Sequence, residues 1–239
     1  MQILIVNDDG ITNEGIIELA RWAVTIGDVI VIAPDQEQSG KSQSVNLHNE
    51  FRAWKTDFAV KEIKEAWAVQ LSPADCVAFG YHYLGLRPDY VFSGINRGYN
   101  IGKEIAYSGT CGAILEACTL GLKAVAFSTR ARSLSVAVAN LQKGWDYLIG
   151  NGLFSRCAIW NINYPDIPAP DMEIRMVRTG GIYLPDHIDH IEGDVYKRAR
   201  IHGSLDLDNM ETDIGTVTHG HIAVTPLTVD QTDHAALGH

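Results

Sequence analysis

The chain has 239 residues, of which 46% are hydrophobic and 20% are charged, so its composition is that of a globular protein rather than a disordered or collagen-like chain. Its 29 acidic residues outnumber its 19 basic residues, which gives a net charge of −10. An acidic surface repels a polyphosphate backbone, so we expect no binding to long nucleic acid. A small phosphorylated ligand is still compatible with this charge if a bound metal ion attracts it locally.

The N-terminus and the cysteines favour a soluble protein of the cytoplasm. The first apolar run, residues 3–6, is too short for a signal peptide, and no apolar stretch approaches the ~18 residues that cross a bilayer. The four cysteines form no CxxC pair, which is typical of small buried side chains in a reducing compartment. We therefore expect no membrane contact and a cytoplasmic location. The cysteines are Cys76, Cys111, Cys118 and Cys157.

Short apolar runs alternate with helical patterns over the first part of the chain. The expected strands are 3–6, 28–33, 89–92 and 124–127. The expected helices are 14–26, 73–83, 110–120 and 134–148. This alternation predicts an α/β, Rossmann-like fold with a doubly wound, mostly parallel sheet.

After about residue 155 the alternation ends. The segments 158–162, 174–177 and 222–225 are typical of strands, whereas residues 180–220 are rich in Gly, His, Asp and Asn with little periodicity. The latter stretch predicts extended arms or hairpins used in contacts between subunits. We accordingly expect a metal-binding catalytic core over residues 1–155. The C-terminal strands and an oligomerisation arm, residues 156–239, should pack on the same domain.

Oxygen-bearing side chains follow three of the expected strands. Asp8 and Asp9 come after the first, Ser39 and Gly40 after the second, and Asn96 after the third. In a doubly wound sheet these strand ends meet at one edge, and a divalent cation there relieves the repulsion between adjacent carboxylates. The oxygen set of Asp8, Asp9, Ser39 and Asn96 suits Mg²⁺ or Mn²⁺ better than zinc. The alternative is that the two acids only cap a turn or the following helix.

Small residues open the expected helix at 110–120. Ser108, Gly109 and Thr110 let the backbone approach a ligand closely, and the free N–H groups of a first helical turn bind anions. A plain Ser/Thr helix cap is the alternative. Beside a metal site we favour phosphate binding, because a metal and a helix start together hold a phosphoryl group from two sides. Gly40 and Asn96 complete the predicted phosphate-binding set.

Other phosphate and hydrolase motifs are incomplete. The sequence SGKS at 39–42 resembles the end of a Walker A motif, but Asp35 stands where the first glycine belongs. The first strand is not followed by GxGxxG, which disfavours a nicotinamide dehydrogenase. A GxSxG elbow is missing, and the adjacent acids do not form the Asp-x-Asp of a haloacid-dehalogenase-type phosphatase.

Four motifs in the same order resemble the SurE family, the survival protein E phosphatases that act as 5′-nucleotidases. They are ILIVNDDGI at 3–11, VIAPDQEQSG at 31–40, PDYVFSGINRGYNIG at 88–102 and YSGT at 107–110, followed by AVTPLTVDQT at 223–232. The chain departs from the family pattern in LSPADC at 71–76, where GTPxDC is usual, and at Asn46, where threonine is common. These departures spare the predicted metal set and bear on substrate preference.

The resemblance implies a divalent metal held by Asp8, Asp9, Ser39 and Asn96, and a C-terminal arm exchanged in a homodimer or homotetramer. It also implies metal-dependent hydrolysis of nucleoside 5′-monophosphates to nucleoside and phosphate. Exopolyphosphatase or broader phosphatase activity is a further expectation. We expect Asp8 and Asp9 to be catalytic, with Asp8 as general base or nucleophile. The alternative is a non-hydrolytic, metal-dependent nucleotide-binding or sensor protein.

Overall fold

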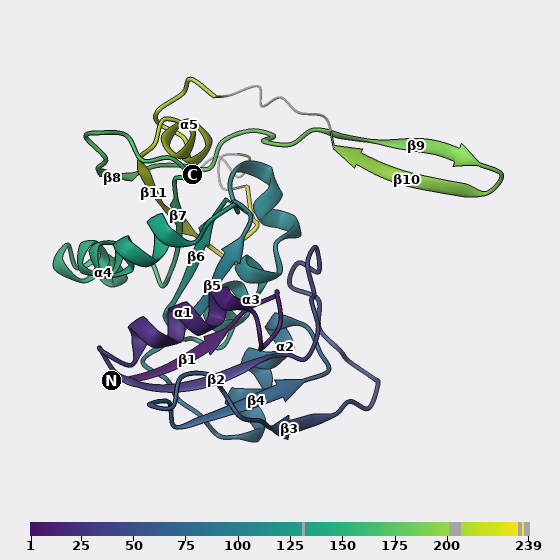
Figure 1. Cartoon of the computed structure of the whole chain (residues 1–239), viewed down its shortest axis with the longest axis vertical. Coiled ribbons are helices and arrows are strands. Elements are labelled where there is room, and N and C mark those ends of the chain that lie inside the picture. The colour runs from purple at the N-terminus through teal and green to yellow at the C-terminus, as the bar shows by residue number, and fades with distance from the viewer. Residues whose placement is uncertain (131, 201–206, 234–235, 237–239) are drawn as a thin grey trace.

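A large, mostly parallel sheet forms the centre of the molecule (Figure 1). A computed structural model describes residues 1–130, 132–200, 207–233 and 236, and within these ranges the sheet has the strand order β3-β4-β2-β1-β5-β6-β7-β11-β8. The strands are β1 Gln2–Val6, β2 Asp28–Pro34, β3 Ala53–Lys55, β4 Glu65–Val69, β5 Tyr90–Arg97, β6 Ala124–Thr129, β7 Ile159–Tyr164, β8 Ile174–Met176 and β11 Ile222–Leu227. From β4 through β7 in that order the strands run parallel, whereas β3 and β11 run antiparallel to their inner neighbours.

Helices cover both faces of the sheet. The longer helical segments are α1 Glu14–Ala23, α2 Pro73–Ala78, α3 Gly109–Thr119, α4 Ser135–Gly150 and α5 Asp213–Thr218. Helices α1 and α4 pack on one face and α2 and α3 on the other, over two separate parts of the core. Strand β1 contributes side chains to both parts of the core, because Ile3 and Ile5 face α1 and α4 whereas Leu4 and Val6 face α2 and α3. The predicted doubly wound α/β fold is confirmed.

Four elements in the N-terminal part of the chain differ from the sequence-based expectation. Strands β3 and β4 were not predicted, because β3 is very short and β4 lies next to it near the sheet edge with a mixed polarity pattern. The helix expected over 73–83 is α-helical only to Ala78 and continues as a π-helical turn, Phe79–Tyr83. The helix expected over 14–26 ends at Ala23.

The segment after β8 forms the predicted hairpin and one unexpected helix. Strands β9 (Asp186–Glu192) and β10 (Val195–Arg200) pair antiparallel in a hairpin that projects away from the body (Figure 1). The sequence pattern did not predict α5, and residues 201–206 lie outside the described part. Strands β7, β8 and β11 belong to the same sheet as the N-terminal strands. A division of the chain near residue 155 stays a prediction.

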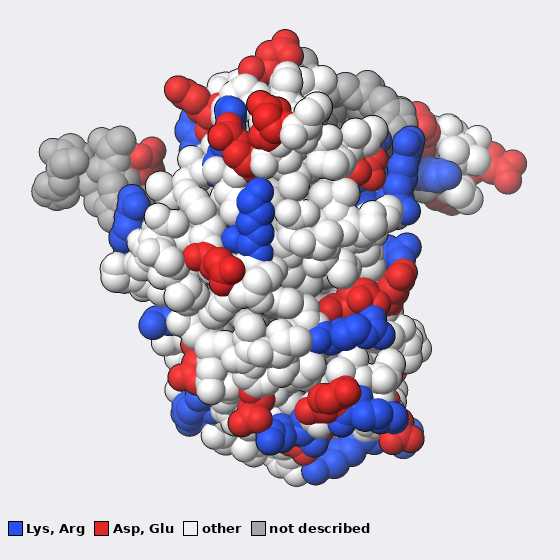
Figure 2. Space-filling view, turned by 60° about the vertical axis from the view of Figure 1, so that its left-hand side comes forward, with Lys and Arg blue, Asp and Glu red and all other residues white. Residues whose placement is uncertain are grey.

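Surface and cysteine features bear on the composition-based predictions. On the face shown in Figure 2, acidic and basic side chains are interspersed. None of the helices in the described ranges combines the length and the apolar character that a bilayer crossing requires. The four cysteines are free; Cys76 and Cys111 are buried as predicted, whereas Cys118 and Cys157 are only half-buried.

Candidate functional site

The site lies where the chain changes direction within the sheet, between β1 and β5. From β1 the chain moves outward through β2 to β4 and then returns to β5 on the other side of β1. The connections after β1 and β5 therefore lead away from each other, which opens a crevice at the carboxyl ends of these strands. Asp8 and Asp9 directly follow β1, and Asn96 lies near the end of β5.

A cavity of about 280 Å³ occupies this crevice. Its lining includes the whole predicted metal set, and also Gly40 and Ser108. The structure thus brings together residues that are up to 100 positions apart in the chain. A larger hollow of about 760 Å³ lies near β8 and β11; it is lined by Arg156, Arg175 and Arg178 among others and contains none of the predicted residues.

Asp8 is deeply buried in this cavity. The residue is 3% exposed, and the Thr110 hydroxyl donates to its Oδ1 at 2.7 Å. Burial raises the pKa of Asp8 to about 6; the Thr110 hydrogen bond opposes this rise and the neighbouring Asp9 carboxylate adds to it. A bound cation would offset the cost of the buried charge.

Asp9 supplies a carboxylate oxygen that a cation can satisfy. Its Oδ2 is buried and has no hydrogen-bond partner among the described residues. Burial also raises the pKa of Asp9, while the backbone N–H of Arg97 opposes the rise. A buried polar atom without a partner is costly, so an orphaned carboxylate oxygen beside a second acid fits a hard divalent cation.

Asn96 and Ser39 complete the oxygen set. Asn96 donates through Nδ2 to the Gly98 carbonyl at 2.8 Å, which leaves the amide oxygen as a ligand. Ser39 Oγ donates to Glu37 Oε1 at 2.8 Å and keeps its lone pairs. In the described ranges, His, Cys, Asp and Glu form no group of three or more arranged for a metal. A cation in this cavity would therefore use the hydroxyl, the amide and water besides the two acids.

A glycine in β5 shapes the end of the strand, which carries Asn96. The register between β5 and β6 shifts between Gly94 and Asn96. Gly94 has φ +131°, and a Cβ there would lie 2.3 Å from the Phe127 carbonyl oxygen. Such an irregularity redirects the following side chains, and only glycine fits this position. A glycine inside a strand pattern is the sequence signal for it.

Helix α3 begins at the cavity wall and supports Asp8 from behind. The hydroxyl of Ser108 caps the helix by accepting the Cys111 N–H at 3.0 Å. Thr110 is fully buried and bonded to Asp8, and a Cβ at Gly109 would lie 2.9 Å from the Asp8 Cβ. Phosphate binding by residues 108–110 stays a prediction. The supporting role was missed because Thr110 and Asp8 are 102 positions apart.

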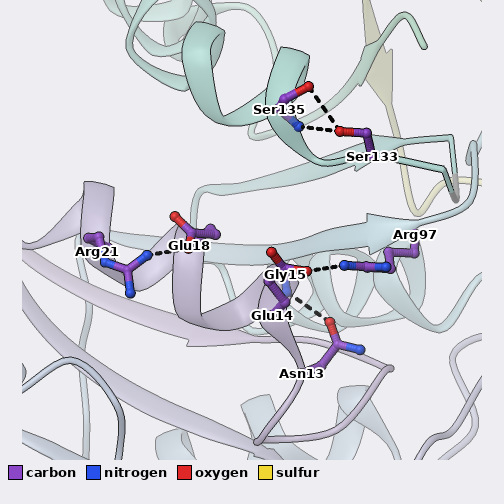
Figure 3. A network of polar contacts seen from close by, with 8 residues as sticks. All are labelled: Asn13, Glu14, Gly15, Glu18, Arg21, Arg97, Ser133 and Ser135. Carbon is purple, nitrogen blue, oxygen red and sulfur yellow. Dashed lines mark hydrogen bonds and ion pairs between the residues drawn. The ribbon is translucent and has the colours of Figure 1, made fainter.

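Arg97 lines the cavity and ties the end of β5 to α1. Its guanidinium pairs with Glu14 in the first turn of α1 (Figure 3). The adjacent N-cap, Asn13, accepts the N–H of Gly15 at 2.8 Å. A Cβ at Gly15 would lie 2.0 Å from the Ile95 carbonyl oxygen, so α1 starts in close contact with β5.

The remaining wall comes from the base of the arm and was not predicted. The Glu104 carboxylate accepts the N–H groups of Tyr183 at 3.1 Å and of Leu184 at 2.9 Å. The Tyr183 ring packs edge-on against Tyr99, with centroids 6.0 Å apart. All four residues line the cavity. No local pattern marks them, because the contacts join segments about eighty positions apart.

The two departures from the family pattern meet beside this cavity. The Asn46 N–H donates to the Asp75 carboxylate at 3.0 Å, and Ser72 Oγ donates to the Ser44 carbonyl at 2.6 Å. These residues line a neighbouring hollow of about 530 Å³. The departures thus lie apart from the metal set, and their effect on substrate preference stays a prediction.

Known proteins match this chain over nearly its whole length. The family model described as survival protein SurE matches residues 3–183. Proteins named 5′-nucleotidase SurE from Geotalea uraniireducens and Brevibacillus brevis are 35% and 34% identical; each alignment covers 99% of this chain, and 96% and 94% of the respective relative. The crystal structure of the SurE protein from Aquifex aeolicus aligns with a TM-score of 0.78 at 27% identity, over 100% of this chain and 97% of that one. The matched range holds Asp8, Asp9, Ser39 and Asn96, and the fold agrees as well. The chain therefore belongs to the survival protein SurE family, as the motifs predicted.

Proposed function

We propose that this protein is a metal-dependent phosphomonoesterase that hydrolyses nucleoside 5′-monophosphates to nucleoside and phosphate. The observation that carries this proposal is the cavity in which Asp8, Asp9, Ser39 and Asn96 meet, with a buried Asp9 oxygen that has no partner among the described residues. The name 5′-nucleotidase carried by relatives that align over almost the full chain supports the substrate class.

The chain's own residues have distinct roles in this reaction. When bound, Mg²⁺ or Mn²⁺ supplies positive charge for the phosphoryl oxygens and for activating water. Asp8 accepts a proton from the attacking water, and we favour this role over direct attack. Thr110 holds the Asp8 carboxylate in place. Ser108 and the first-turn N–H groups of α3 orient the phosphate.

Phosphate release from a substrate panel tests this function. We expect release from AMP, GMP, CMP and UMP with Mg²⁺ or Mn²⁺, and only background release with EDTA, because the metal completes the site. Polyphosphate in the same panel tests the broader activity. Tight nucleotide binding without phosphate release contradicts the proposal and favours a sensor. Release from polyphosphate alone contradicts the substrate class.

We also propose that the β9–β10 hairpin joins copies of this chain into a homodimer or homotetramer. Ile188, Ile191, Val195 and Tyr196 on the hairpin are each more than half exposed. A two-stranded hairpin with exposed apolar side chains is marginally stable alone, so a second copy that covers them stabilises it.

Charged residues on the hairpin are expected to reduce the molar mass in solution. The double variant Ile188→Glu with Ile191→Glu places charge in the apolar contact, and light scattering coupled to gel filtration measures the result. Ile167→Glu is the matched control, because Ile167 is 75% exposed on the body of the protein. An unchanged mass in the double variant, or an equal loss in the control, contradicts the role of the hairpin.

A further inference from the structure

Buried polar side chains form a layer on one face of β6, β7 and β11. Asn161 and Asn163 are two positions apart on β7, so they lie on the same face, and both are fully buried. Ser128 of β6 pairs in register with Asn163, and Thr225 of β11 pairs with Asn161. Earlier on β7 the same face carries Ile159, which belongs to the apolar core. The polar layer is therefore confined to the carboxyl end of the strand, where the site lies.

This layer holds Asn100 through both its backbone and its side chain. The Asn100 N–H donates to Asn163 Oδ1 at 3.0 Å, and its Nδ2 donates to Ser128 Oγ at 2.9 Å. Its carbonyl oxygen accepts Nδ2 of Asn161 at 2.7 Å and Nδ2 of Asn163 at 3.0 Å. One residue is thus fixed by three partners on two neighbouring strands.

Asn100 belongs to the irregular segment that forms one wall of the cavity. Between the end of β5 at Arg97 and the turn that begins at Gly102, the chain has no regular secondary structure, so its course depends on side-chain hydrogen bonds. The Asn96 amide is bonded to the Gly98 carbonyl within this segment. Asn96 and Asn100 both line the cavity. Asn100 thus follows by two residues the carbonyl that orients the Asn96 amide.

Stability alone does not require amides behind this segment. Hydrogen bonds only offset the cost of burying polar groups, and well-packed apolar side chains of similar volume can serve a core equally well. Asn161 Oδ1 and Thr225 Oγ1 are buried without a partner in the described part of the chain. The layer is thus not optimal as a core, but it gives Asn100 a defined position.

We propose that Asn161 and Asn163 are positioning residues of the metal site. They act through Asn100 to fix the segment whose Gly98 carbonyl orients the Asn96 amide, and they do not themselves line the cavity. The proposal rests on the proposed function for its catalytic consequence, whereas its consequence for metal binding is measured separately.

Calorimetric titration with Mn²⁺ tests the positioning role. Asn163→Leu keeps a similar volume and removes both bonds to Asn100, so we expect Mn²⁺ binding weaker by about ten- to a hundredfold, the usual effect of losing support behind a ligand. Ser128→Ala removes only the bond to the Asn100 side chain and is expected to give a smaller loss. Raising the Mn²⁺ concentration is expected to restore part of the phosphate release of Asn163→Leu.

Two matched controls separate positioning from packing. Thr225→Val removes a buried hydroxyl of the same layer that makes no bond to Asn100, and Ile162→Val trims the opposite face of β7 in the apolar core. Both are expected to bind Mn²⁺ like the wild type. If Asn163→Leu does not fold, Ser128→Ala decides the question.

Several results overturn the positioning role. These are wild-type Mn²⁺ affinity in both Asn163→Leu and Ser128→Ala, an equal loss in either control, or a wild-type protein that binds no Mn²⁺. A wild-type protein that binds Mn²⁺ but releases no phosphate refutes the proposed function alone, and the Mn²⁺ titrations of the variants still decide the positioning role.

Discussion

Replacing Asp8 by asparagine is expected to abolish phosphate release and, at pH 7, to raise the melting temperature of the metal-free protein. The loss of turnover should be about a thousandfold or more, because the change removes a proton acceptor and the negative charge that holds the cation. The gain in stability arises because the buried carboxylate is charged at pH 7 without a cation. A pKa raised from 3.8 to about 6 corresponds to roughly 3 kcal/mol at pH 7. Asparagine keeps an oxygen that can accept the Thr110 hydroxyl.

The pH dependence of unfolding identifies the Asp8 carboxyl as the source of this gain. The folded protein holds the Asp8 proton more tightly than the unfolded chain does. The stabilising contribution of the protonated acid is therefore fully present below about pH 3.8 and is lost as the pH rises through about 6. The stability difference between Asp8→Asn and the wild type should thus increase from pH 4 to pH 7. Thermal unfolding in EDTA across this range measures it, and a difference independent of pH would argue against the buried charge.

Added metal provides the control for the Asp8 variant. Mn²⁺ is expected to bind the folded wild type and to raise its melting temperature, whereas the variant should respond weakly. Phosphate release by Asp8→Asn at a near wild-type rate, with metal present, would show that the site has been assigned to the wrong residue.

Replacing Gly109 by alanine is expected to lower kcat by about a hundredfold, the usual effect of moving a catalytic group by ~1 Å. The added Cβ would lie 2.9 Å from the Asp8 Cβ and 3.2 Å from its Oδ2, so the carboxylate must move. The hydrogen bond from Thr110 holds the other carboxylate oxygen, Oδ1, and limits a smooth adjustment. Steady-state phosphate release at saturating metal measures the effect.

Gly150→Ala is the matched control for this variant. Gly150 ends α4, and a Cβ there meets no atom within 4 Å in the described structure. Alanine also favours a helix over glycine, so kcat should be unchanged and stability equal or slightly higher. A Gly109→Ala protein with wild-type kcat would mean that the Asp8 position tolerates this crowding.

The sequence predicts the strands most clearly where both faces of a strand are buried. Strands β1 and β2 are apolar at every central position because helices cover both faces, and this pattern has few other interpretations. Once these strands were placed, the residues that follow them had to meet at one edge. The order of the strands therefore predicts the oxygen set of Asp8, Asp9, Ser39 and Asn96 without knowledge of the side-chain packing.

The supporting contacts could not be predicted in the same way. The Thr110 bond to Asp8 and the Asn163 bonds to Asn100 join distant segments. The local patterns mark Asp8 and Thr110 as site residues but not their contact, and Asn163 does not stand out in its local pattern. Asn161 and Asn163 lie in a short run that resembles an ordinary strand with polar positions. Their role depends on strand register and on the course of an irregular segment, which a single sequence does not specify.

The strand order also has a consequence for synthesis of the chain. Strand β1 is made before the other strands described for this sheet. In the folded protein it lies between β2 and β5, and β5 extends to Arg97. Until that residue has been made, one edge of β1 has no neighbour, although the strand is almost wholly apolar. Open apolar edges invite pairing with other chains, so the growing chain is exposed to aggregation until β5 has been made.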